Sequence, residues 1–249
     1  MPRRPIAVFA ITIAALGCAV TGASAAPPGV PSTVQVATII PNAPFAFRQG
    51  GKLTGFDVQL ANAIAKVAGI RVLQWRPVQL SQLVAQTAAG ITPMAAASLT
   101  ITADRQKLVT FGTPYLNANL AIVTRRGNAV AQDGNLSNLT VAALKGSTAA
   151  QYISGLPDVI DVTYPNMTQG YTALLRGTVD AVVNDHAQSA WYVSHNASRF
   201  LLAATINQPG KIAFAFNKNH NALRNAFNAG LATVKANGTH QRLVNRWMP

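Results

Sequence analysis

The 249-residue chain contains no glutamate, so all seven of its acidic residues are aspartates. Any reaction that depends on a catalytic glutamate is therefore excluded, and acid–base catalysis by a carboxyl pair would need two of these aspartates. Only 11% of the residues are charged, whereas 49% are hydrophobic. This composition excludes a disordered chain and indicates one large domain or two ordinary ones.

Cysteine is nearly absent as well, and the single one, Cys18, lies in a segment with the features of a secretory signal peptide. A basic start at Arg3 and Arg4 precedes residues 6–20, which carry no charge, and Ala-Ser-Ala at 23–25 matches a cleavage site. The apolar run is shorter than the ~18–20 residues that a spanning helix needs. We therefore expect a signal peptide over residues 1–25 and a periplasmic mature protein.

Cys18 also raises the alternative of a lipoprotein, because a lipidated cysteine becomes the first residue of the mature chain. The preceding Ala-Leu-Gly at 15–17 matches the usual Leu-small-small pattern poorly, so we expect cleavage without lipidation. Cleavage removes this cysteine and two arginines, and the net charge then falls from +13 to +11. The exported chain would form no disulfide and would be held by its core alone.

Strands and helices are predicted to alternate in two series. Residues 34–40 (VQVATII) are rich in β-branched residues and do not alternate, which is typical of a buried strand. Residues 58–68 place apolar side chains on one helical face, with Asp57 as the N-cap. Gly50-Gly51 indicates a hairpin tip. The alternation predicts an α/β protein with mostly parallel sheets flanked by helices. Further strands are predicted over 70–75, 140–144, 159–164, 179–184 and 211–216, and helices over 80–87, 147–154, 168–176, 221–235 and 239–247.

A series of short motifs runs along the predicted mature chain. The motifs are APF at 43–45, GKLTGFDV at 51–58, SLTITADR at 98–105, FGTPY at 111–115, LKGST at 144–148, LRGTVDAVVND at 175–185 and Gly238-Thr239. Each is weak alone, but in this order and at these spacings they resemble the family 3 extracytoplasmic solute-binding proteins, the polar amino-acid-binding components of ABC importers. The resemblance covers essentially all of the mature chain.

The resemblance implies a two-lobed periplasmic-binding-protein fold of type II, with a ligand cleft between lobes that close by a hinge. Lobe 1 is expected over residues 30–120 plus 217–249, and lobe 2 over 121–216. Hinge strands are expected near 119–125 and 211–217. The implied partners are a small amino acid and the membrane permease of an ABC importer, and we expect a monomer that binds no cofactor, metal or nucleic acid.

The resemblance makes Arg105 the partner of the ligand α-carboxylate and Asp185 the partner of its α-ammonium group. An arginine fork meets a carboxylate in two parallel hydrogen bonds, and a carboxylate at the end of a strand suits an ammonium group. Without the resemblance, Arg105 would be read as a solvated helix residue and Asp185 as a cap. The other ligand-binding residues that the resemblance implies are Ser98 and Thr100 in the first lobe, and Ser147 and Thr148 in the second.

The chain departs from the family pattern where the ligand side chain is usually held between two aromatic rings. These positions fall at Asn42 and at Leu80, or at Gln79 if the local gap is placed differently. Ile39 stands where relatives that prefer lysine or arginine have an acidic residue. We therefore expect a ligand with a neutral or acidic side chain, with Asn42, Thr148 and Asn184 offering hydrogen bonds.

Two alternatives come from other classes of function. Some relatives on this fold are cyclohexadienyl dehydratases, but their reaction depends on a cleft glutamate, which this sequence lacks. We therefore expect no enzymatic activity. A sensory protein that docks its closed form to a membrane receptor would have the same sequence features as a transport protein, so that alternative stays open.

Overall fold

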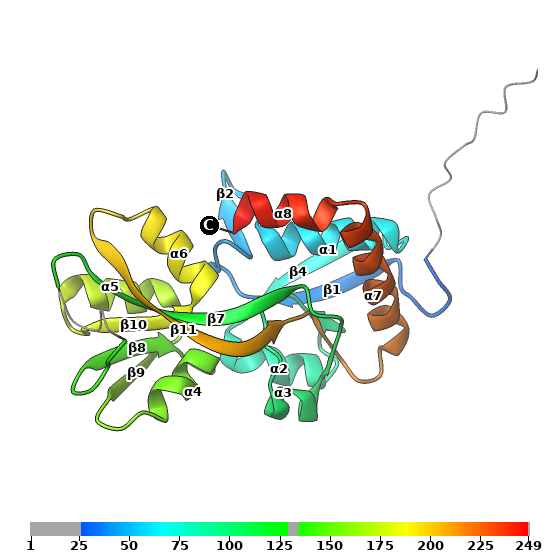
Figure 1. Ribbon diagram of the computed structural model, residues 1–249. Coiled ribbons are helices and arrows are strands. Elements are labelled where there is room, and N and C mark those ends of the chain that lie inside the picture. The colour runs from blue at the N-terminus through cyan, green and yellow to red at the C-terminus, as the bar shows by residue number, and fades with distance from the viewer. Residues whose placement is uncertain (1–25, 129–133, 249) are drawn as a thin grey trace, which may run out of the picture.

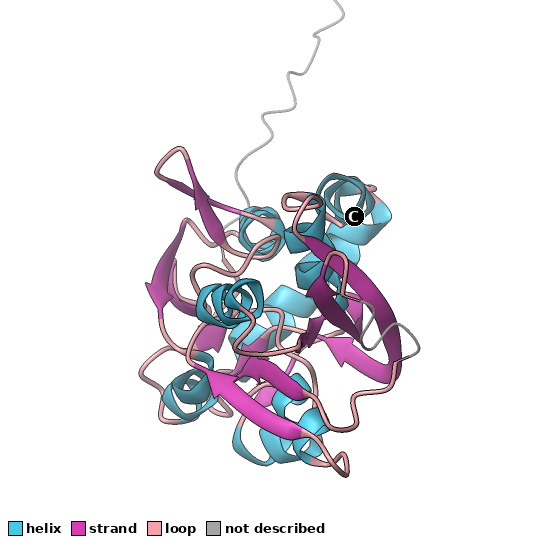
Figure 2. Cartoon of the chain, turned by 90° about the vertical axis from the view of Figure 1, so that its left-hand side faces the viewer, coloured by secondary structure: helices cyan, strands magenta, loops and turns pink. Residues whose placement is uncertain are grey.

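The computed structural model describes residues 26–128 and 134–248. It contains two five-stranded β-sheets that lie side by side, with helices packed around them (Figures 1 and 2). The predicted signal peptide and Cys18 lie outside the described residues. Within the described ranges, no helix is both long enough and apolar enough to cross a membrane.

The first sheet has the strand order β4-β1-β5-β12-β6. Its first two pairings are parallel and its last two are antiparallel. Its strands are β1 (Thr33–Thr38), β4 (Val72–Pro77), β5 (Met94–Ala95), β6 (Thr110–Phe111) and β12 (Ala215–Phe216), and its half of the molecule also contains α1 (Phe56–Val67), α2 (Leu80–Ala88), α3 (Ala103–Leu108), α7 (Asn221–Ala236) and α8 (Thr239–Trp247).

The second sheet has the order β11-β7-β10-β8-β9 and is also mixed. The parallel pairs are those that the strand–helix alternation predicts, and the α/β class is confirmed. Its strands are β7 (Leu116–Arg125), β8 (Thr140–Leu144), β9 (Ile160–Tyr164), β10 (Ala181–Asp185) and β11 (Phe200–Ile212), with α4 (Thr148–Ser154), α5 (Met167–Arg176) and α6 (His186–Ser194) packed on it.

One long antiparallel pair of strands, β7 and β11, lies where the chain crosses between the two sheets. The pair runs from Leu116 opposite Ile212 to Arg125 opposite Phe200, with irregular register between Ile206 and Gly210. Figure 1 shows these two strands reaching from the second sheet toward the first. The connection between the sheets is therefore a two-stranded ribbon. The prediction of a single strand over 211–216 is wrong, because β11 ends at Ile212 and β12 begins only at Ala215.

The hairpin at Gly50-Gly51 is confirmed, since it joins β2 (Phe47–Gln49) to β3 (Lys52–Thr54). The apolar face predicted for α1 is buried, and Ile64 packs so closely on Gly230 of α7 that a Cβ there would lie 2.9 Å from its side chain. The prediction that Asp57 caps α1 is wrong. The N-cap residue is Gly55, and no side chain caps the helix. Asp57 turns into the interior instead.

Candidate functional site

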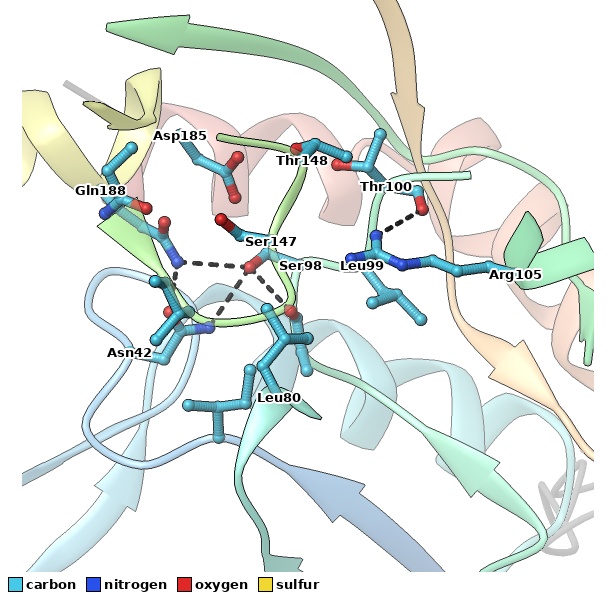
Figure 3. A pocket seen from close by; sticks show the side chains of 14 residues that line it. Asn42, Leu80, Ser98, Leu99, Thr100, Arg105, Ser147, Thr148, Asp185 and Gln188 are labelled. Atoms are coloured by element: carbon cyan, nitrogen blue, oxygen red, sulfur yellow. Dashed lines mark hydrogen bonds between the residues drawn. The ribbon is translucent and has the colours of Figure 1, made fainter. Parts of the chain in front are cut away.

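All eight residues predicted to bind ligand line one pocket between the two sheets, called here the interlobe pocket (Figure 3). Loops that follow β1 and β5 bring side chains from the first half, and the ends of β8 and β10 bring those of the second. The lining residues are Ile39, Asn42, Leu80, Ala97, Ser98, Leu99, Thr100, Arg105, Leu144, Ser147, Thr148, Asn184, Asp185 and Gln188. The sequence therefore predicted which residues come together, although their ligand contacts stay a prediction.

Arg105 lies on α3, whose N-cap Thr102 accepts from the Arg105 backbone N–H at 3.3 Å. The guanidinium is partly buried and bridges both halves of the molecule. One terminal nitrogen donates to Thr100 O at 2.8 Å, and the other donates to Gly146 O at 3.1 Å. Burial lowers the pKa of Arg105, and the charge of Asp185 offsets part of that change. The alternative of a freely solvated arginine is therefore wrong.

Asp185 is the last residue of β10 and immediately precedes α6. It is the N-cap residue of α6, but its side chain makes no capping hydrogen bond. Burial raises the pKa of Asp185 to about 6, although the positive charge of Arg105 acts in the opposite direction. Among the described residues the only ion pair within 4.0 Å joins Lys107 and Asp104. Asp185 and Arg105 thus lie in one pocket, feel each other's charge, and are not bonded.

Ser147 and Thr148 begin α4 at the edge of the pocket. Ser147 is the N-cap, and its Oγ accepts from Ala150 N–H at 3.0 Å. Ser147 therefore caps this helix, and its position in the pocket lining is compatible with that role. Leu80, the first residue of α2, adds an apolar side chain to the lining.

Ser98 has an unusual backbone and is the centre of a buried polar cluster. Its φ is 47°, in the left-handed region, and its N–H donates to Asp57 Oδ2 at 2.6 Å. Ser98 Oγ accepts from Asn42 Nδ2 at 3.2 Å and from Gln188 Nε2 at 3.4 Å, as Figure 3 shows. Tyr115 Oη donates to the other Asp57 oxygen at 2.8 Å. Asp57 therefore acts as a buried support for the pocket rather than as a helix cap.

Gln188 is a polar lining residue that the sequence analysis did not predict, as are the apolar Leu99 and Leu144. It lies on α6, a helix that was not predicted, three positions after Asp185, and this spacing brings it to the same side of the helix. Its Nε2 donates to Asn42 Oδ1 across the pocket. The sequence signal that could have identified Gln188 was a polar residue about one helical turn after Asp185, the expected partner of the ligand ammonium group. Among the described residues, no cluster of three His, Cys, Asp or Glu side chains could hold a metal ion.

Two α/β halves joined by a ribbon, with a charged pocket between them, define a two-lobed solute-binding protein. The family model for bacterial extracellular solute-binding proteins, family 3, matches residues 34–249. The chain belongs to this family. The resemblance predicted from the motifs is therefore confirmed.

Known relatives share both sequence and fold with the chain. It is 29% identical over 210 residues to the probable amino-acid-binding protein YxeM of Bacillus subtilis (strain 168), covering 82% of this chain and 79% of that protein. An ancestral arginine-binding protein bound to arginine has a TM-score of 0.82 and 30% identity, covering 88% of this chain and 99% of the other. The ancestral amino acid-binding protein AncCDT-1, a precursor of cyclohexadienyl dehydratase, has a TM-score of 0.78 and 28% identity, covering 88% and 96%.

Proposed function

We propose that the protein captures an amino acid in the interlobe pocket and delivers it to the permease of an ABC importer. The observation that carries this proposal is the relationship between Arg105 and Asp185. Two opposite charges line one pocket without forming an ion pair. An α-amino acid carries the complementary charges on adjacent atoms, so it can bind both residues at once, whereas neither residue satisfies the other.

Arg105 is the proposed partner of the ligand carboxylate. Two bonds to backbone oxygens from different lobes already orient its guanidinium, and an oriented fork loses less side-chain entropy when it binds a carboxylate. Thr100 and Thr148 stand nearby in the lining and offer hydroxyl groups. Asp185 is the proposed partner of the ammonium group, which would relieve the cost of holding a carboxylate away from solvent. Ser98 and Ser147 complete the polar lining.

The ligand side chain is proposed to be neutral or acidic. Asp185 is the only carboxylate in the lining of the interlobe pocket, and the α-ammonium group occupies it in this proposal. A cationic side chain would then be desolvated without a partner, which is costly. A solved relative bound to arginine has the same fold. The proposed difference in ligand preference therefore concerns the pocket residues and leaves the architecture unchanged. Leu80, Ile39 and Asn42 provide the corresponding uncharged wall.

Export of the chain and closure of its two lobes are parts of the proposed function. Export by a signal peptide over residues 1–25 would place a monomeric carrier in the periplasm, in keeping with the family's extracellular description. Lobes over 30–120 plus 217–249 and over 121–216 would close about the strands near 119–125 and 211–217. Ligand that touches both lobes favours the closed form, because only differential contact moves such an equilibrium.

A binding role is preferred to an enzymatic one. The pocket lining contains one acidic and one basic residue, and both are assigned to the α-groups of the ligand. No second carboxylate or histidine remains in that lining to act as acid or base.

Isothermal titration of the mature protein with the twenty amino acids and small dicarboxylates tests the proposal. At least one α-amino acid should bind, and at one hundred times its dissociation constant it should stabilise the protein by ~2.7 kcal/mol. Arg105→Ala should abolish binding without lowering the melting temperature of the free protein, whereas Arg71→Ala, at an exposed site, should change neither. The absence of binding by every amino acid, or full affinity in Arg105→Ala, would refute it.

A further inference from the structure

The side chain of Gln188 is the part of the pocket that the α-groups of an amino acid leave unexplained. The residue is only 8% exposed. Its Nε2 donates to Asn42 Oδ1 and, at 3.4 Å, to Ser98 Oγ. Its Oε1 is buried and has no hydrogen-bond partner among the described residues. A buried acceptor without a donor is unfavourable, so this oxygen indicates a donor that arrives with a ligand.

A second cavity lies beyond Gln188, and it is called here the aromatic cavity. Its volume is about 280 Å³, compared with about 20 Å³ for the interlobe pocket. In this arrangement of the lobes the interlobe pocket has room for roughly one water molecule, so the lobes must separate to admit an amino acid. The two spaces share part of their lining, including the hydrogen-bonded pair Asn42 and Gln188. In Figure 3 this pair lies at one end of the interlobe pocket and Arg105 at the other. The pair therefore lies where the two spaces adjoin.

The aromatic cavity suits an uncharged group. Tyr171 and Tyr192 stack with ring centroids 3.6 Å apart and an interplanar angle of 10°, and Trp191 also lines the space. The lining contains no Asp, Lys or Arg, and the Nδ1 of its one histidine, His195, lies 2.8 Å from Trp191 O. A charged side-chain end would enter without a counter-charge, whereas an amide could bond to the amides of Asn42, Asn184 and Gln188.

We propose that Gln188 selects the ligand side chain, and that the preferred ligands are uncharged amino acids with a long hydrogen-bonding side chain, for which glutamine is the probe. This inference rests on the proposed function, because the α-groups must first be held by Arg105 and Asp185. The Asn42–Gln188 bond gives way as the ligand side chain passes toward the aromatic cavity. The ligand amide supplies the donor that Gln188 Oε1 lacks. Alanine is too short to reach it, and glutamate presents a second acceptor.

Calorimetric titration of the mature protein with glutamine, alanine and glutamate tests the inference. The wild-type protein should bind glutamine more tightly than either of the others. Gln188→Leu keeps the size of the side chain but removes its hydrogen bonds, so it should weaken glutamine binding by about three- to tenfold and alanine binding by less than about twofold. Gln82→Leu, at an exposed position on α2, is the matched control and should change neither affinity.

A second variant tests the path of the side chain. Thr168 lies on α5 and lines the aromatic cavity at an exposed position, so Thr168→Phe should fill part of the cavity. Glutamine binding should weaken while alanine binding stays the same. Melting temperatures of the free proteins show whether each variant is folded.

The outcomes separate the two proposals. If amino acids bind but Gln188→Leu weakens glutamine and alanine equally, or weakens neither, then Gln188 does not select the side chain and the inference is overturned. Unchanged glutamine affinity in Thr168→Phe overturns the path through the aromatic cavity. If the wild-type protein binds no amino acid, the proposed function itself fails.

Discussion

The buried carboxylate of Asp57 accepts a 2.6 Å hydrogen bond from the backbone N–H of Ser98, 41 residues further along the chain. Ser98 has a φ of 47°, a conformation that costs about 1–3 kcal/mol for a residue other than glycine and persists only where its surroundings impose it. Tyr115 Oη holds the second oxygen of the same carboxylate. The shape of the interlobe pocket around Ser98 therefore depends on a side chain that does not line it.

Removing the Asp57 carboxylate should destabilise the protein, and more strongly in acid than in base. Asp57→Ala leaves the Ser98 N–H and the Tyr115 hydroxyl without their acceptor, at a cost of about 1–3 kcal/mol. Burial raises the pKa of Asp57 to about 6, so the wild-type protein holds a costly buried charge above that pH. The loss measured by urea unfolding should be larger at pH 5 than at pH 8. Asp104→Ala, at an exposed position, should change stability far less, because exposed ion pairs contribute little.

Tyr115→Phe should show the opposite pH trend. The hydroxyl donates to the Asp57 carboxylate at 2.8 Å, and a hydrogen bond to a charged acceptor is worth more than one to a neutral acceptor. The loss should be about 1.5–3 kcal/mol at pH 8 and about 0.5–1.5 kcal/mol at pH 4. Chemical denaturation at both pH values measures it. A loss that does not depend on pH would show that the bond does not support the charged form.

Replacing Asp185 should stabilise the free protein while it removes binding. The pKa of Asp185 is raised from 3.8 to about 6, so the folded state binds its proton more tightly than the unfolded state does. This group's contribution to stability therefore falls as pH rises between those values, and its full penalty is present above pH 6. Asp185→Asn should raise the unfolding free energy by about 1–2 kcal/mol at pH 8 and leave it unchanged at pH 4. Asp161→Asn, at an exposed site, is the control.

Ligand binding should respond to the same titration with the opposite sign. An ammonium group prefers the charged carboxylate, so affinity should be constant above pH 6 and fall by about tenfold per pH unit below it. Asp185→Asn should weaken binding by about thirtyfold or more and remove the pH dependence. Calorimetry from pH 4.5 to 8 follows both. An affinity that stays level through pH 5 in the wild-type protein would contradict the proposed role of Asp185.

Gly146 permits close approach of the two lobes, and a substitution there should weaken ligand binding. Its φ is 80°, its carbonyl accepts from Arg105, and a Cβ would lie 3.4 Å from Ser81 Cα. Gly127 has a φ of 83° but open space around its Cβ. Both Gly→Ala variants should lose about 1–2 kcal/mol of stability from backbone strain. Only Gly146→Ala should also lose ligand affinity, as measured by titration; equal affinities in the two variants would contradict a role in lobe closure.

Most helices and turns could be predicted from the sequence, because the residues that specify them are close together in the chain. The face of α1 follows from residues three and four apart, and the Gly-Gly turn follows from two adjacent residues. The second long strand of the ribbon, β11, was not predicted, because Asn-Gln-Pro-Gly at 207–210 interrupts its apolar residues and is typical of a turn. Its pairing with β7 comes from a partner about 80 residues away in the chain.

The sequence by itself predicted the α/β class from its local patterns, and its resemblance to a known family named eight residues that the structure brings together in one pocket. Only the tertiary structure decided what Asp57 and Gln188 do. Their partners lie on distant segments, as Ser98 does for Asp57 and Asn42 for Gln188. No short pattern encodes burial by the whole fold. That burial raises the pKa of Asp185, and within the described part of the chain it leaves Gln188 Oε1 without a hydrogen-bond donor.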